Sequence, residues 1–345
     1  MNEIKKLIEE SVGSLFEKHA DSDAIEIMES GGFPATFWDE FSEGGWRSIA
    51  LTEDEGGAGM GLAGGYILMR LSGYHAVPLP IVESIISVHL LALAGAPLTD
   101  GFTALAVADA GFQVDGTSAL PRVPWARHAS NLVVIMPGEN NTRIALVDRD
   151  KWTVKEHTNM AGEPRDDVLL ANDALGELFE LPGVSTERIL SWLALGRAAQ
   201  MTGALSRILE CTVEYANERK QFGRLISKFQ ALQQQISVQA EHVNAAQCAV
   251  DAGILHLNTP HEWECIAAAK IRTGEAVGHV CRIAHAVHAA IGFTREYPLQ
   301  LSTRRSWSWR DEYGNEAWWA TKLGDLCLGL ERGQLWSWLS EQTNG

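Results

Sequence analysis

Apolar residues recur at the spacing of an α-helix over most of the C-terminal half, and this repeat constrains the fold more than any other feature. Ser185 or Thr186 can cap a helix that continues to about Glu218, which would make it about 45–50 Å long. Further helical patterns lie in residues 229–258, in residues 261–290 and after Gly314. Four long helices with short joints predict a helix bundle.

Short apolar runs replace the helical pattern between residues 101 and 182. They are separated by Gly, Asn, Asp and Pro, and they lie at 103–107, 132–136, 142–147, 168–170 and 178–181. Such runs predict a small antiparallel β domain. The N-terminal part of the chain, residues 1–100, again shows helical patterns, which glycines interrupt. The chain is therefore predicted to be mainly α with a small β middle domain, divided into residues 1–100, 101–182 and 183–345.

The joint between the first two long helices, residues 215–230, is the clearest candidate site. It carries a cation (Arg219), an aromatic ring (Phe222) and an amide (Gln230) around a turn at Gly223. Such a joint can present one guanidinium, one ring face and one amide to an anionic, aromatic ligand. The alternative is a solvated corner between two helices, with no ligand.

Two other local patterns suggest ligand sites and are rejected. Gly59, Gly61 and Gly64 satisfy G-x-G-x-x-G, but no β-branched strand precedes them and the approach is acidic, so we expect an interhelical loop. His285 and His288 share a helix face, but no carboxylate or further thiol falls at ligand spacing. We therefore expect no metal site.

The charge excludes some classes of partner. The formal net charge of −16 would repel a nucleic-acid backbone. No apolar run is long enough to span a bilayer, and the N-terminus has no signal-peptide core. The five cysteines are scattered and odd in number, which is typical of reduced thiols. We expect a cytoplasmic protein that binds neither nucleic acid nor membrane.

Two segments resemble the signatures of acyl-CoA dehydrogenases. The first is Glu218–Gly223 followed by Phe229-Gln230, and the second is Ala289–Pro298. The resemblance implies the family fold, with an N-terminal helical domain, a middle β domain and a C-terminal four-helix bundle. It also implies FAD as cofactor, an acyl-CoA substrate and α,β-dehydrogenation of the thioester.

The family's catalytic base is a glutamate at one of two places, and neither holds a carboxylate here. Counting from the two signatures, the positions are Tyr313 and Leu193. Glu312 adjoins the first position, and a loop before Gly314 could re-aim it. Glu187 lies six residues before Leu193, nearly two helical turns away. Glu312 is therefore the better candidate base.

The resemblance also assigns cofactor contacts. It implies that Arg219, Phe222 and Gln230 reach FAD across a subunit interface, and that His288 and Ala290 lie beside its adenosine part. The hydroxyl-bearing loop and the Trp-x-Thr segment that hold the flavin ring in the family are not legible in the β domain.

A short chain without a base or a flavin-ring loop resembles the short subunits of heterotetrameric, steroid side-chain-type acyl-CoA dehydrogenases. Such a subunit completes a partner's flavin site. Two alternatives remain open, a self-sufficient homotetramer that uses Glu312 and a flavin-free scaffold.

Overall fold

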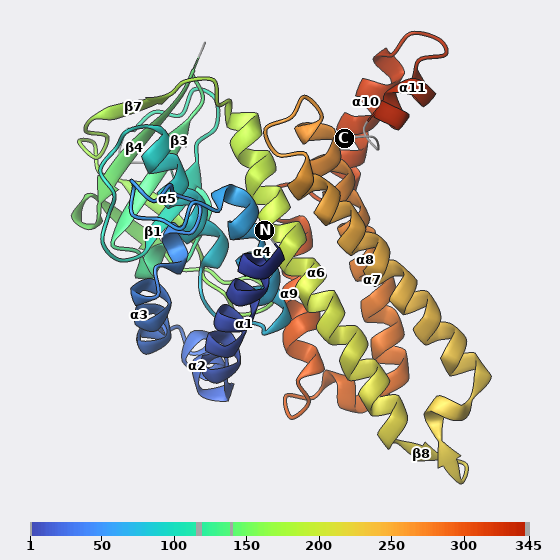
Figure 1. Cartoon of the computed structure of the whole chain (residues 1–345). Coiled ribbons are helices and arrows are strands. Elements are labelled where there is room, and N and C mark those ends of the chain that lie inside the picture. The colour runs from blue at the N-terminus through green and yellow to red at the C-terminus, as the bar shows by residue number, and fades with distance from the viewer. Residues whose placement is uncertain (1, 115–118, 139–140, 342–345) are drawn as a thin grey trace. The chain divides into compact units, whose positions relative to one another are not determined.

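The computed structural model describes residues 2–114, 119–138 and 141–341. The chain forms two compact units, which we describe separately. Unit 1 comprises residues 1–68 and 77–193, and unit 2 comprises residues 69–76 and 194–345. Two helices, α4 and α6, contribute residues to both units (Figure 1).

The N-terminal part of unit 1 is helical, as predicted. Phe16, Phe37 and Phe41 pack together in its core, and the side chain of Asp21 caps α2 by accepting a hydrogen bond from the N–H of Ala24. The expected interhelical loop is present only before Gly61, and no strand precedes it between α3 and α4. Gly59 lies in this loop, whereas Gly61 and Gly64 lie in the first turn of α4. The helices are α1 (Asn2–His19), α2 (Ser22–Glu29), α3 (Ala35–Glu43), α4 (Gly61–Tyr74) and α5 (Ile81–Leu93).

The described residues of the β part of unit 1 form two sheets. The first has the order β1-β3-β4-β7, and the second has the order β2-β6-β5. The first consists of β1 (Thr103–Val107), β3 (Asn131–Met136), β4 (Thr142–Asp148) and β7 (Leu178–Leu181). The second consists of β2 (Ala119–Pro124), β5 (Trp152–Lys155) and β6 (Arg165–Leu170).

The prediction of a purely antiparallel β domain is wrong in one pairing. Strands β1 and β3 are parallel, with Thr103 opposite Asn131, whereas β3–β4 and β4–β7 are antiparallel. A parallel pair requires a crossover of a dozen or more residues. Strand β2 and a 3₁₀ turn at Ala126–His128 lie within that crossover. An apolar run does not encode its direction, so the sequence left this pairing undetermined.

Unit 2 consists mainly of long helices, and the predicted ones are present. The buried faces of α6, α7 and α8 meet at residues such as Leu205, Val243 and Val277. The helices are α6 (Thr186–Glu218), α7 (Gln230–Leu255), α8 (Glu262–His288), α9 (Leu299–Asp311), α10 (Glu316–Gly329) and α11 (Leu335–Glu341). Helix α9 was not predicted, because its buried face includes Ser302, Thr303 and Arg305 rather than a clean apolar stripe.

Candidate functional site

The joint between α6 and α7 contains a short β-hairpin with a two-residue turn. Strand β8 (Lys220–Gln221) pairs with β9 (Arg224–Leu225), and Phe222 and Gly223 form the turn with φ of 51° and 78°. Two consecutive positive φ angles are characteristic of the tight turns that match the twist of paired strands. Glycine adopts such angles freely, but a phenylalanine there stores backbone strain. Strain of this kind is common at functional sites.

Phe222 is the most exposed large apolar side chain in the described part of the chain, at 92%. Its ring is nearly perpendicular to the Phe229 ring, at an interplanar angle of 78° and with centroids 6.1 Å apart. The guanidinium of Arg224 lies 4.0 Å from the centroid of the same Phe229 ring. The Phe229 ring therefore contacts both Phe222 and the guanidinium of Arg224, while most of the Phe222 ring faces solvent.

Arg219, just before the hairpin, and Gln230, at the start of α7, are also exposed. With its amide oxygen turned toward Arg219, Gln221 accepts hydrogen bonds from Nη2 (2.8 Å) and Nε (3.3 Å) of that residue. The backbone N–H of Ile226 donates to the carbonyl of Arg219, which closes the hairpin at 2.8 Å. Phe222 thus lies in the turn of the hairpin, Arg219 directly precedes the hairpin, and Gln230 is the first residue of α7.

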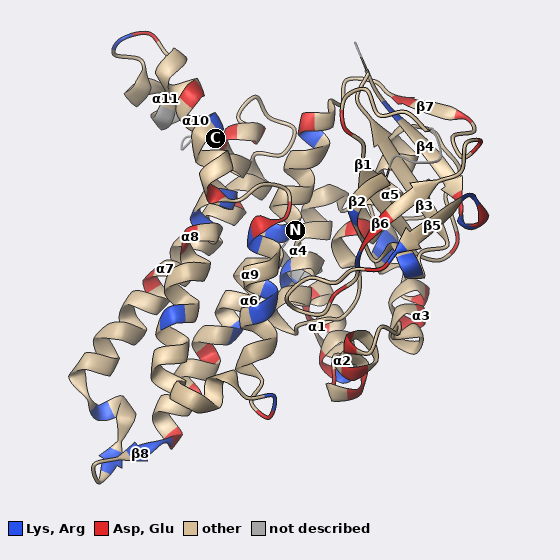
Figure 2. Cartoon of the chain, turned by 180° about the vertical axis from the view of Figure 1, so that it is seen from behind, with Lys and Arg blue, Asp and Glu red and all other residues tan. Residues whose placement is uncertain are grey.

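The hairpin is basic although the chain is acidic. Arg219, Lys220, Arg224 and Lys228 fall within about ten residues, in a chain of net charge −16. Figure 2 shows Lys or Arg positions, in blue, around the label β8 at the end of the long helices. Such a local reversal of charge favours an anionic ligand at this end.

His288 is buried at the end of α8, with 1% of its surface exposed. Its Nδ1 is 2.8 Å from the carbonyl oxygen of Ala284, and its Nε2 is 3.3 Å from the hydroxyl of Tyr297. The ring stacks on Tyr215 at 4.5 Å, and burial lowers the pKa of the imidazole. Both ring nitrogens are therefore engaged within the chain. Ala290, by contrast, is exposed in the 3₁₀ turn that follows.

Glu312 lies outside helix α9, in the turn that leads to α10. Tyr313 and Gly314 follow with φ of 57° and 90°, so the backbone reverses there. The side chain of Glu312 is 18% exposed, and its Oε2 accepts a hydrogen bond of 2.6 Å from Nε of Arg197, which is 2% exposed. Arg197 also donates to Oε1 of Gln200 at 2.7 Å. The candidate base is thus held by a buried guanidinium.

The second predicted base position is apolar and buried. Leu193 lies on α6 with no exposed surface. Glu187 lies in the first turn of α6 and is exposed, which suits a carboxylate near a helix N-terminus.

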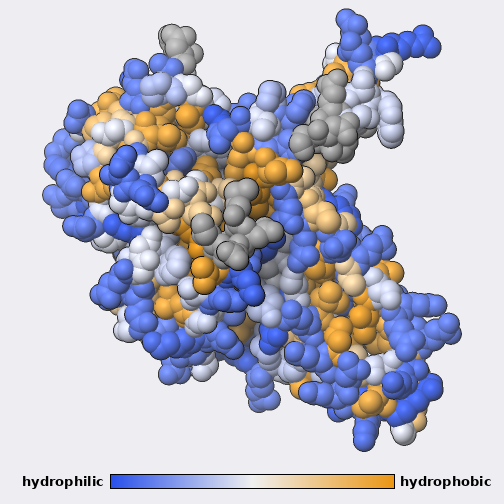
Figure 3. Space-filling model, viewed as in Figure 1, coloured by the Kyte–Doolittle hydropathy of each residue, from blue (hydrophilic) through white to orange (hydrophobic). Residues whose placement is uncertain are grey.

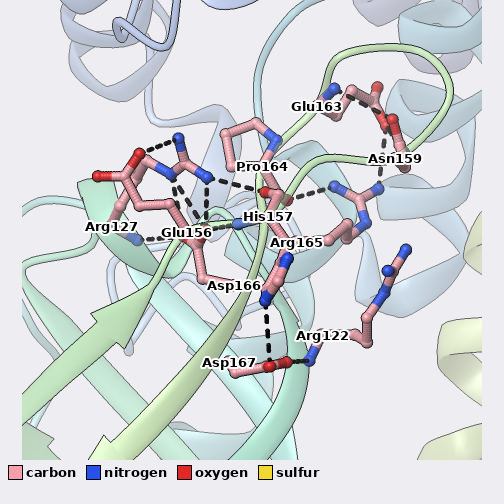
Figure 4. Close-up of polar contacts among 10 residues, drawn as sticks. All are labelled: Arg122, Arg127, Glu156, His157, Asn159, Glu163, Pro164, Arg165, Asp166 and Asp167. Atoms are coloured by element: carbon pink, nitrogen blue, oxygen red, sulfur yellow. Dashed lines mark hydrogen bonds and ion pairs between the residues drawn. The ribbon is translucent and has the colours of Figure 1, made fainter.

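A buried ionic network in the second sheet was not predicted from the sequence. The carboxylate of Asp166, with no exposed surface, accepts hydrogen bonds from Arg127 and from the backbone N–H of His157. A second buried pair joins Arg165 to Glu163 at 3.0 Å (Figure 4). The charged residues at 163–167 were the sequence feature from which this network could have been predicted. The pairs hold the loop before β6, and we assign them a structural role.

Two domain families match this chain. The N-terminal domain of acyl-CoA dehydrogenases matches residues 2–99, and the C-terminal domain matches residues 183–314, which together make up about two thirds of the chain. The chain belongs to the acyl-CoA dehydrogenase family. Members of this family are oxidoreductases that dehydrogenate acyl-CoA thioesters and generally use FAD.

Individual relatives agree with this assignment. The acyl-CoA dehydrogenase IpdE2 of Mycolicibacterium smegmatis is 28% identical over 314 residues, which are 89% of this chain and 93% of the relative. The ChsE4-ChsE5 complex of Mycobacterium tuberculosis has the same fold, with a TM-score of 0.84 at 18% identity, over 95% of this chain and 98% of that one. The structure of glutaryl-coenzyme A dehydrogenase has a TM-score of 0.79 at 17% identity, over 96% of this chain and 97% of that one. The predicted fold class and the resemblance to the acyl-CoA dehydrogenase family are confirmed.

The remaining features concern membranes and metals. Among the described helices, none is long and apolar enough to cross a membrane. Within residues 2–114, 119–138 and 141–341, no group of three His, Cys, Asp or Glu side chains is arranged to hold a metal ion.

Proposed function

We propose that this chain is a subunit of a heteromeric acyl-CoA dehydrogenase and completes an FAD site that a partner subunit shares. The exposure of Phe222 on a strained hairpin carries the proposal. Apart from its contact with Phe229, a large ring that is 92% exposed buries little surface against its own chain, so a contact with another molecule accounts for it best. A heteromeric complex among the structures of the same fold supports this reading.

The side chains on the hairpin fit the chemistry of FAD. Its pyrophosphate suits the guanidinium of Arg219, and its flat rings suit the exposed face of Phe222. The amide of Gln230 can donate to the same ligand. The exposed turn at Ala290 is a second proposed contact, and His288 contributes by anchoring the end of α8.

The base for the reaction is proposed to come from the partner. Removal of the α-proton needs a positioned proton acceptor, while bound FAD supplies the hydride acceptor. Leucine cannot accept a proton, and a phenol, with an ordinary pKa of about 10, is rarely an anion at neutral pH. Leu193 and Tyr313 therefore leave both family positions without a carboxylate.

A self-sufficient enzyme is the second candidate. The position of Glu312 outside α9, with part of its side chain exposed, favours it, because the turn can aim a carboxylate differently from a helix. The charge-assisted bond from Arg197 counts against it, since that bond engages one carboxylate oxygen.

Flavin retention tests the proposal. The chain is purified alone and together with an acyl-CoA dehydrogenase subunit encoded by a neighbouring gene, and the flavin absorbance per chain is measured. Flavin is expected in the assembly, and Arg219→Ala should weaken its retention about ten- to hundredfold, since one charge-assisted bond contributes about 1.5–3 kcal/mol. Lys220→Ala is the control, because it removes an equal charge from the next position on the strand.

Three results would contradict the proposal. Full flavin in the chain alone would favour the self-sufficient enzyme. Absence of flavin from every assembly would favour a scaffold. Equal losses in Arg219→Ala and Lys220→Ala would indicate a general charge effect rather than a contact.

A further inference from the structure

The turn between α9 and α10 is built against one buried lysine. Lys270 lies on α8 with no exposed surface. Its Nζ donates to the carbonyl oxygen of Arg310 at 2.6 Å and lies 3.4 Å from that of Trp309. The last carbonyls of a helix lack intrahelical partners and carry partial negative charge. The ammonium of Lys270 therefore caps the C-terminus of α9 from a neighbouring helix.

Charged groups of both signs surround this ammonium. Arg197 pairs with Glu312 at 2.6 Å, and Nε of Arg310 donates to Glu316 at 2.9 Å. The charged groups that act on Lys270 are Arg197 on α6, Asp311 on α9, Glu312 in the turn and Glu316 on α10. Arg310 on α9, whose carbonyl accepts from Lys270, is the third cation of the cluster and pairs with Glu316. With Lys270 protonated, the three cations balance the three anions.

The same contacts fix the backbone that carries Glu312. The N–H of Glu312 donates to the carbonyl of Trp309 at 3.3 Å, which is one of the two carbonyls near Lys270. On the other side of the turn, Nε1 of Trp319 donates to the carbonyl of Tyr313 at 3.0 Å. The chain on both sides of Glu312 is thus tied to buried groups.

We propose that Lys270 is a positioning residue, whose ammonium holds the end of α9 and so sets the direction in which Glu312 projects. The inference deepens the second candidate function, in which Glu312 is the base. An effect of Lys270 on turnover rests on that function. The positioning itself can be measured without turnover.

The charge of Lys270 changes in the neutral range. Burial lowers the pKa of its ammonium to about 7. Above that pH the cluster carries one net negative charge, and the cap loses its charge-assisted character. The turn is therefore expected to loosen as the pH rises through about 7.

Amide hydrogen exchange of the full chain tests this inference. Lys270→Met keeps an unbranched apolar side chain up to the position of Cε and removes the ammonium. At pH 6, residues 310–314 should exchange about tenfold faster in Lys270→Met than in the wild type, with α7 unchanged. In the wild type, protection of this segment, corrected for intrinsic rates, should fall between pH 6 and 8.5. The variant should show no such step.

Thr273→Val is the matched control, because Thr273 lies about one turn further along α8, is equally buried, and its hydroxyl donates to the carbonyls of Ala269 and Lys270 on the same helix. It should leave the turn protected. Equal protection in Lys270→Met and the wild type, or equal loosening in Thr273→Val, would overturn the inference. If Lys270→Met does not fold, the wild-type pH series decides alone, and a flat profile for residues 310–314 overturns it.

Discussion

At the scale of single residues, the pair between Arg197 and Glu312 decides how the second candidate function is tested. The guanidinium is buried and fixed by Gln200, so it cannot withdraw to leave a free carboxylate without breaking a second bond. A carboxylate held this firmly resembles a structural ion pair more than a base. Removing one partner of a buried pair is also costly to stability, about 3–5 kcal/mol. Activity and folding must therefore be measured together.

Glu312→Gln should leave turnover intact in the active assembly if the base belongs to the partner. The amide keeps the shape and an acceptor oxygen for Arg197 while removing the proton acceptor. Glu187→Gln is the control at the start of α6. A loss of turnover of about 10²–10⁴-fold in Glu312→Gln, with flavin and fold retained, would instead identify a self-sufficient enzyme.

Lys270 predicts how stability depends on pH. Its pKa is about 7 in the folded chain against an ordinary 10.5, so above pH 7 the unfolded chain binds more protons. The free energy of unfolding should therefore rise with pH from 7 to 9, by at most about 1.4 kcal/mol per pH unit. Higher pH is avoided, because burial raises the pKa of Cys281 to about 12 and gives the opposite slope there.

Urea unfolding of the wild type and Lys270→Met across pH 7–9 measures this contribution. The variant should show the smaller rise. Parallel pH profiles in the two proteins would mean that Lys270 does not lose its proton in this range.

At the scale of elements, the hairpin between α6 and α7 combines strain with exposure. Phe222 holds a φ of 51°, which asparagine tolerates far better than phenylalanine. Phe222→Asn should therefore raise the free energy of unfolding by about 1 kcal/mol, while lowering flavin retention in the assembly. Urea unfolding and flavin absorbance measure the two effects. A ring kept only for packing would give a loss of stability and unchanged flavin.

The elements differ in how far the sequence specified them. Helix α6 begins and ends within a residue of its prediction, because its apolar period runs unbroken between a capping residue and the joint. Strand β2 was missed because Pro121 and Pro124 argue against a strand, and it contains a register shift between Leu120 and Val123. The local sequence pattern therefore predicts helix boundaries well, but it predicts strands with prolines or register shifts poorly.

The candidate site was predictable in part. The spacing of Arg219, Phe222 and Gln230 suggested a shared joint, and the structure places them on one hairpin and its flanks. The sequence could not show that Arg197 meets Glu312, or that Lys270 meets Arg310, because those partners lie 115 and 40 residues apart. Contacts between distant segments depend on tertiary packing rather than on local pattern.

At the scale of the whole molecule, unit 2 exposes more apolar surface than a solitary helix bundle needs. Val238 and Leu255 on α7 are 39% and 68% exposed, and Phe293 after α8 is 70% exposed. Figure 3 shows hydrophobic surface along the region of the long helices on the face in view. From these exposed apolar side chains we infer an interaction surface on unit 2.

We therefore expect the protein to assemble as a dimer or tetramer, with itself or with a second acyl-CoA dehydrogenase subunit. Burying these side chains in an interface removes apolar area from water, which contributes about 25 cal/mol per Å². Light scattering at micromolar concentration should give at least twice the mass of one chain. Leu255→Glu should shift the protein toward the monomer if α7 forms the interface, whereas Glu241→Lys, on the same helix and already exposed, should not. A monomer in the presence of the partner subunit would refute both the assembly and the shared flavin site.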